Sequence, residues 1–453
     1  MSKRMRGSAL TAIVIVVVTL LLLLVGELHC CCCAKSPPAA ASTPKSQAVP
    51  AAAHSQAPTI SPPRRRRHNA RQQQAAPPPP APRKQDDHHP VQPQQPSVAE
   101  AEAVCGRAID SNNNTSTSSI DDGGRCSTLL VFGDSTVDPG NNNHLLTKAK
   151  ANFLPYGVSF LDAYGRSPTP TGRFSNGRLP TDMLAEKLGI ARSIPGFFDP
   201  TLKLSQLING VSFASAGSGY DHATAKRLNV VSFSTQIKQL WRYKLLMRKL
   251  MGPTRAERLV NRATFVVSAG TNDILFNYLD SNRSGYNTMP EYDSYLMQRL
   301  ANYTQVMMML GGRRFLFAGL PPIGCLPIAR TLLGAGEDRC DDNLNEVAAS
   351  FNSKLLDLSN SINCNHQQDA RSAYIDTYNI IREATNNPSN FGLTEVWRGC
   401  CGSGMIEVGQ TCRGRTTCTD PTKYLYWDAV HPTETTNQLI TNAMLASIQQ
   451  LYS

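Results

Sequence analysis

This sequence predicts an α/β fold in which a parallel central sheet carries helices on both faces, and two observations lead to that class. Five short apolar runs lie between residues 126 and 453, and none of them alternates apolar with polar residues, which indicates burial on both faces of the sheet. Longer amphipathic stretches separate these runs. Strands that alternate with helices form parallel sheets through right-handed crossovers, so the order of the segments predicts the layers.

The expected strands and helices follow one another from residue 129 onward. The expected strands are Leu129 to Phe132, Val211 to Ala214, Phe265 to Ser268, Phe315 to Ala318 and Ala373 to Ile375. The expected helices are Gln236 to Met251, Tyr292 to Leu310, Leu344 to Ile362 and Asn437 to Leu451. Sheets of this kind carry their sites at the carboxyl ends of the strands, so the residues that directly follow each strand are the candidates for chemistry.

The composition divides the chain into three regions, residues 1–34, 35–125 and 126–453. In the first region, basic residues precede an apolar stretch from Ala9 to Val25 and small residues follow it, which is the order of a secretory signal peptide. The stretch holds 17 residues, fewer than the roughly 20 that span a membrane comfortably. A cleaved signal and a secreted protein are therefore favoured, and an uncleaved membrane anchor facing the lumen or the exterior is the alternative.

Residues 35–125 are expected to form a disordered spacer. They are rich in Pro, Ala and Gln and have few large apolar residues, so they cannot bury enough surface to offset the entropy lost on ordering. Four consecutive arginines, Arg64, Arg65, Arg66 and Arg67, predict at most weak contact with an acidic polymer of the cell surface. Of the formal net charge of +11, the residues before Cys105 carry +7, so nucleic acid is not an expected partner of the folded region.

Nine of the thirteen cysteines lie from Cys105 onward, and in a secreted protein they are expected to form disulfides. Because nine is odd, at least one thiol is free or pairs outside the domain. Cys325 and Cys340 are close enough to close one loop, whereas the pairing stays open among Cys400, Cys401, Cys412 and Cys418. A zinc site in this second cluster is the weaker alternative, because paired C-x-x-C spacing is absent. Glycosylation sequons stand at Asn113, Asn114, Asn282 and Asn302.

Four segments carry groups suited to catalysis. "VFGDSTVDPGNNN" places Ser135 after the first expected strand, "FASAGSGYD" places Gly217 after the second, and "VVSAGTNDI" places Asn272 after the third. "YWDAVHPTE", near the C-terminus, places Asp428 three residues before His431. Three of these segments follow strands that are expected to end at the same edge of the sheet.

These residue types meet the requirements of acyl transfer. A serine hydroxyl attacks a carbonyl when a base takes its proton and a carboxylate orients that base, and Ser135, His431 and Asp428 supply the three groups. The N–H groups of Ser135 and Gly217 and the side-chain amide of Asn272 are candidate donors to the developing oxyanion. Plainer interpretations exist: Gly-Asp-Ser is a common turn, Asn272 is a candidate helix N-cap, and Asp-x-x-His-Pro is a candidate salt-bridged loop. Their joint occurrence in this order favours catalysis.

Six segments resemble the successive sequence blocks of plant GDSL-type esterase/lipases, a family within the SGNH hydrolases. The segments are "VFGDSTVDPGNNN", "TGRFSNGR", "GVSFASAGSG", "VVSAGTNDI", "GLPPIGCLP" and "YLYWDAVHPTE". The resemblance spans about Cys126 to Leu451 and implies a flavodoxin-like three-layer α/β/α fold. By position it makes Ser135 the nucleophile, His431 the base and Asp428 its partner. It makes Ser135, Gly217 and Asn272 the oxyanion hole, and "TGRFSNGR" is expected to be a structural loop.

The resemblance also implies an activity. It predicts a monomeric carboxylic-ester hydrolase that works through an acyl-enzyme, without metal or organic cofactor, in the extracellular space or cell wall. The nearest alternative is an acyltransferase with the same site. An alternative from another class is a catalytically silent protein that binds cell wall or lipid, which the intact motifs disfavour.

Overall fold

The computed structural model describes residues 128–452 apart from 162–164, 279–285, 287, 335, 337 and 366–368. The predicted leader and spacer, residues 1–34 and 35–125, lie outside the described residues, as do three of the four sequons. None of the helices within the described ranges combines the length and hydropathy that a membrane span requires.

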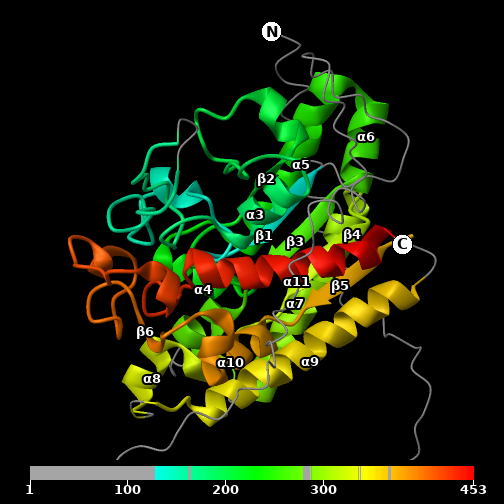
Figure 1. Ribbon diagram of the computed structural model, residues 1–453. Helices are drawn as coiled ribbons and strands as arrows, with labels where there is room; N and C mark the ends of the chain where they lie inside the picture. The colour runs from blue at the N-terminus through cyan, green and yellow to red at the C-terminus, as the bar shows by residue number, and fades with distance from the viewer. Residues whose placement is uncertain are drawn as a thin grey trace, which may run out of the picture. The chain divides into compact units, whose positions relative to one another are not determined.

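Five parallel strands form the central sheet (Figure 1). They are β1 (Leu129–Gly133), β2 (Gly210–Ser212), β3 (Thr264–Ser268), β4 (Arg314–Ala318) and β5 (Arg371–Ile375), in the spatial order β2-β1-β3-β4-β5. Each lies within two residues of a predicted strand, and the sheet confirms the predicted fold class. The direction of the strand order changes between β1 and β3, and such a switch point is where open α/β sheets carry their sites.

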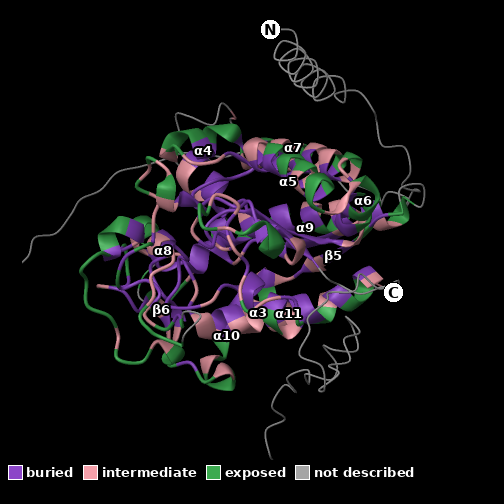
Figure 2. Ribbon diagram, turned by 90° about the horizontal axis from the view of Figure 1, so that it is seen from above, coloured by how far each residue is buried: buried purple, intermediate pink, exposed green. Residues whose placement is uncertain are grey.

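Helices cover both faces of the sheet, which makes three layers. Figure 2 shows α5, α7 and α9 on one side of β5, and α3 and α11 on the other. The helices are α3 (Pro180–Lys187), α4 (His222–Leu228), α5 (Phe233–Met251), α6 (Pro253–Arg262), α7 (Met289–Met309), α8 (Pro327–Leu333), α9 (Asp342–Cys364), α10 (Thr377–Asn386) and α11 (Glu434–Tyr452). The four long helices match the predicted ones. The short ones were not predicted, because two or three turns show too little of the helical period.

Aromatic side chains hold the sheet to the helices near the carboxyl end of β1. The ring of Phe132 stacks on those of Phe213 and Phe265, with centroids 5.0 and 5.9 Å apart, and Phe233 of α5 lies against it. All four side chains are buried. Burying each such ring contributes about 2–3 kcal/mol, so the strand ends that follow are held on a rigid platform.

A smaller two-stranded sheet and three disulfides lie outside this core. The parallel strands β6 (Glu395–Gly399) and β7 (Tyr424–Tyr426) were not predicted. The segment between them holds two disulfides, Cys400–Cys418 and Cys401–Cys412, and the predicted Cys325–Cys340 pair is also present. The four clustered cysteines are therefore paired with each other and are not arranged as zinc ligands, while Cys364 is exposed and unpaired.

Candidate active site

Ser135 lies just past the carboxyl end of β1, in a turn that only this local sequence can form. Gly133 has a φ of 148°, and a Cβ there would overlap the carbonyl oxygen of Ser268 on the neighbouring strand. The Asp134 N–H donates to that same carbonyl at 3.1 Å, and the Asp134 carboxylate accepts the Thr136 N–H at 2.9 Å. The turn leaves the Ser135 side chain at the edge of the sheet, 7% exposed.

His431 and Asp428 reach Ser135 from the loop between β7 and α11. The Nε2 atom of His431 lies 2.7 Å from Ser135 Oγ, and its Nδ1 atom lies 2.8 Å from Asp428 Oδ2. Because Nδ1 faces a carboxylate, it carries the ring proton, and Nε2 is left to accept a proton from the serine. The Asp428 carboxylate also accepts the N–H groups of Val430 and His431. The structure thus brings together the three residues that the sequence grouped.

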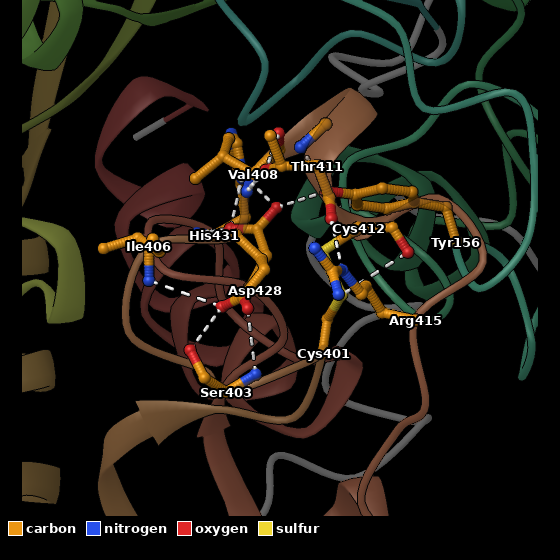
Figure 3. Close-up of a disulfide and its surroundings, with 12 residues drawn as sticks. Tyr156, Cys401, Ser403, Ile406, Val408, Thr411, Cys412, Arg415, Asp428 and His431 are labelled. Carbon is orange, nitrogen blue, oxygen red and sulfur yellow. Dashed lines mark hydrogen bonds and ion pairs between the residues drawn. A yellow bond between two sulfur atoms is a disulfide. The ribbon is translucent and has the colours of Figure 1, made fainter.

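Tyr156 is a fourth member of this network and was not predicted. Its hydroxyl donates to Asp428 Oδ2 at 2.7 Å and accepts the N–H of Gly409 at 2.7 Å (Figure 3). Burial and the neighbouring Asp428 carboxylate raise the pKa of Tyr156, so the hydroxyl keeps its proton and remains a donor. Gly409 belongs to the loop that the Cys401–Cys412 disulfide closes, which links this loop to Asp428.

The "TGRFSNGR" segment holds the histidine loop in place. The Phe174 ring packs on the His431 ring with centroids 4.8 Å apart, and the Ser175 hydroxyl donates to the Pro432 carbonyl. The Asn176 side-chain oxygen accepts the Glu434 N–H at the start of α11, at 2.8 Å. These contacts explain in physical terms why this segment accompanies the histidine: it fixes the loop on both sides of it.

The candidate oxyanion donors occupy the ends of β1, β2 and β3. Within the described residues, neither the Ser135 N–H nor the Gly217 N–H has a hydrogen-bond acceptor. The Asn272 side-chain amide donates to the Ser218 carbonyl at 3.0 Å and makes a longer contact of 3.4 Å with Asp134 Oδ2. An N-cap side chain accepts N–H groups, whereas these Asn272 contacts are donations, so the N-cap interpretation is not supported.

Asp273 and Asp134 hold the segments that carry these donors. The Asp273 carboxylate accepts the N–H groups of Tyr220 and Asp221 at 2.8 and 3.2 Å, and thereby ties the segment after β2 to the segment after β3. Burial raises the pKa of Asp273 to about 7 and also raises the pKa of Asp134. Both carboxyl groups thus lie in a dry interior beside the strand ends, where hydrogen bonds are strong.

A cavity of about 80 Å³ opens beside the serine. Ser135, Asn272 and His431 line it, and Gly217 is not among its lining residues. The other walls are mainly apolar and come from the segments after β4 and β5 and from α11. A reacting carbonyl in this cavity therefore has the Ser135 hydroxyl, the His431 imidazole and the Asn272 amide within one enclosed space.

Comparisons with known proteins agree with this arrangement. Residues 129–444 match the family described as GDSL-like lipase/acylhydrolase. Three curated Arabidopsis thaliana proteins, each named as a GDSL esterase/lipase, are similar to this chain. They are 43%, 42% and 40% identical over 323, 320 and 321 residues. These alignments cover 71%, 68% and 70% of this chain and 88%, 83% and 85% of the relatives.

Proposed function

Because this chain belongs to the GDSL-like lipase/acylhydrolase family and is a carboxylic ester hydrolase, we propose that it cleaves esters through an acyl-enzyme on Ser135. The observation that carries the proposal is the unbroken line of hydrogen bonds from Ser135 Oγ through His431 to Asp428, with lengths of 2.7 and 2.8 Å. All three side chains are buried, so water does not compete for these contacts. This is the arrangement that activates a serine hydroxyl.

In the proposed acylation step, Ser135 Oγ attacks the ester carbonyl carbon while His431 Nε2 takes the serine proton. Negative charge then develops on the carbonyl oxygen, and the unpaired N–H groups of Ser135 and Gly217 and the Asn272 amide are its donors. The carbon–oxygen bond of the ester breaks, and His431 passes its proton to the leaving alkoxide. The alcohol departs, and the acyl group remains on Ser135.

Deacylation uses the same groups in reverse. His431 takes a proton from a water molecule, whose oxygen attacks the acyl carbon, and the Ser135 oxygen leaves and regains the proton from His431. Asp428 stays ionised throughout and stabilises the imidazolium that forms twice per cycle. The chain's own residues supply every proton position in the cycle, and the acid is released.

The proposal is tested with the purified full chain and a series of p-nitrophenyl esters of increasing acyl length. We expect release of p-nitrophenolate, and we expect prior treatment with a fluorophosphonate to stop it. With a sugar or hydroxy-acid acceptor present, free acid should remain the main product, whereas a mainly acylated acceptor would favour the transferase. A chain that hydrolyses none of the esters would contradict the proposal.

Tyr156 is proposed to act as a positioning residue for Asp428, and Tyr156→Phe should lower kcat about 10-fold with KM changed less than twofold. The reason is that a hydrogen bond to a charged group contributes about 1.5–3 kcal/mol, while two backbone donors remain on Asp428. Tyr243→Phe is the matched control, because its buried hydroxyl donates to the Leu207 carbonyl in the core. Equal kcat values for the two variants would reduce Tyr156 to a structural role.

We also propose that the protein is secreted. Its three disulfides support this, because such bonds persist in oxidising compartments. N-terminal sequencing of protein from the cell wall should find the leader removed, and recovery of the full-length chain from the cytosol would contradict secretion.

A further inference from the structure

The cavity beside Ser135 contains buried polar atoms that the proposed mechanism does not use. Thr377 Oγ1, Tyr426 Oη and Asn437 Oδ1 have no hydrogen-bond partner within the described part of the chain. The three residues are only 8%, 2% and 1% exposed, and all three line the cavity. Leaving a buried polar atom unpaired costs about 1–3 kcal/mol, so three in one place require an explanation.

These atoms are concentrated at this site. Nine buried side-chain polar atoms lack a partner across the described ranges, and three of the nine belong to lining residues of this one cavity. They come from three separate elements: Thr377 begins α10, Tyr426 ends β7, and Asn437 lies in the first turn of α11. A set that converges from three elements on one cavity indicates recognition of a ligand group, because folding alone gains nothing from it.

The chemistry of the three atoms selects the group that they fit. The Asn437 amide nitrogen donates to the Arg178 carbonyl at 2.9 Å, which fixes the amide and leaves Oδ1 as an acceptor. The Thr377 and Tyr426 hydroxyls each donate and accept, and burial raises the pKa of Tyr426, so its proton is retained. A ligand group that only accepts would leave Asn437 Oδ1 unpaired. A hydroxyl both donates and accepts, and so fits the set.

The remaining walls limit the rest of the ligand. Leu320, Leu326, Ile381, Ile440 and Met444 line the same cavity with apolar side chains. Its volume of about 80 Å³ is roughly half that of an engineered cavity of about 150 Å³ that binds benzene. The space therefore suits an aliphatic group of only a few carbon atoms.

We propose that the ester group bound in this cavity is a short aliphatic chain that carries a hydroxyl, recognised by Thr377, Tyr426 and Asn437. This inference rests on the proposed ester hydrolysis at Ser135 and adds the substrate class. The hydroxyl belongs either to the acyl part of the ester or to its alcohol part, and the experiment separates the two.

The test compares kcat/KM of the full chain on two matched pairs of esters. In the acyl arm, p-nitrophenyl butyrate is compared with p-nitrophenyl 3-hydroxybutyrate. In the alcohol arm, ethyl butyrate is compared with 2-hydroxyethyl butyrate, with acid release followed by titration. We expect a preference of at least about 10-fold for the hydroxylated ester in one arm, since one or two net hydrogen bonds of about 1 kcal/mol each give that ratio.

Variants then assign the preference to the cavity. Tyr426→Phe and Thr377→Val should each bring the ratio between hydroxylated and plain ester towards one. Tyr243→Phe, which removes a buried hydroxyl outside the lining, should leave the ratio at its wild-type value. Because the readout is a ratio of two substrates on one preparation, a partial loss of folded protein does not change it.

The outcomes separate this inference from the proposed function. Hydrolysis of the plain esters without preference in either arm would overturn the inference alone and leave Ser135 chemistry intact. A preference that persists unchanged in Tyr426→Phe and in Thr377→Val would also overturn it. Absence of hydrolysis of every ester would overturn the proposed function and the inference with it.

Discussion

Replacing Ser135 by alanine should lower ester turnover by about 10⁵- to 10⁶-fold and abolish covalent labelling by a fluorophosphonate. The physical reason is that the variant retains the cavity and the donors but has no oxygen to form the acyl-enzyme. His431→Ala should lower both turnover and labelling, because the hydroxyl then has no base at 2.7 Å. Stopped assays of product release and fluorescence of the labelled chain measure the two effects separately.

Ser359→Ala is the matched control for this variant. The Ser359 hydroxyl is buried on α9 and bonds to Ser372 Oγ at 2.9 Å, outside the cavity lining. We expect it to retain turnover and labelling within about twofold of the wild type. Robust labelling of the Ser135→Ala chain would show that the nucleophile lies elsewhere.

Asn272→Ala should lower kcat about 100- to 1,000-fold while KM changes much less, which corresponds to a loss of roughly 3–4 kcal/mol of transition-state stabilisation. The amide is required only once charge develops on the carbonyl oxygen, so substrate binding does not depend on it. Fluorophosphonate should still label Ser135 in this variant, but more slowly. This pattern differs from that of Ser135→Ala, in which labelling disappears.

Asn345→Ala separates this effect from a general loss of stability. Asn345 is buried, and its side-chain oxygen accepts the Gly324 N–H at 3.0 Å, so its replacement also removes a buried amide. It should lower the unfolding midpoint without a comparable loss of kcat. If Asn272→Ala keeps near-normal turnover in a folded chain, the oxyanion assignment is wrong.

The sheet and the serine–histidine–aspartate cluster could be predicted because their signals are local. Each strand is a short apolar run, and Gly133 ends the first of them at a position where a Cβ would overlap the next strand. Asp428 and His431 are three residues apart, so a single loop brings them together. Ser135 then needed only the parallel topology to place it at the same edge.

The rest depends on contacts that no local pattern contains. Tyr156 precedes Asp428 by 272 residues and meets it only after folding, and the same is true of Thr377, Tyr426 and Asn437 around the cavity. The pairing of Cys400 with Cys418 and of Cys401 with Cys412 depends on the unpredicted sheet of β6 and β7. The leader and the spacer lie outside the described residues, so those predictions remain predictions.

The most direct test of the central claim is to identify the residue that becomes covalently modified. The full chain is treated with a fluorophosphonate, digested, and mapped by tandem mass spectrometry. The account predicts a single phosphonylated site at Ser135, and predicts that prior incubation with a hydrolysed ester reduces the modification. An adduct on any other residue, with Ser135 unmodified, would contradict it.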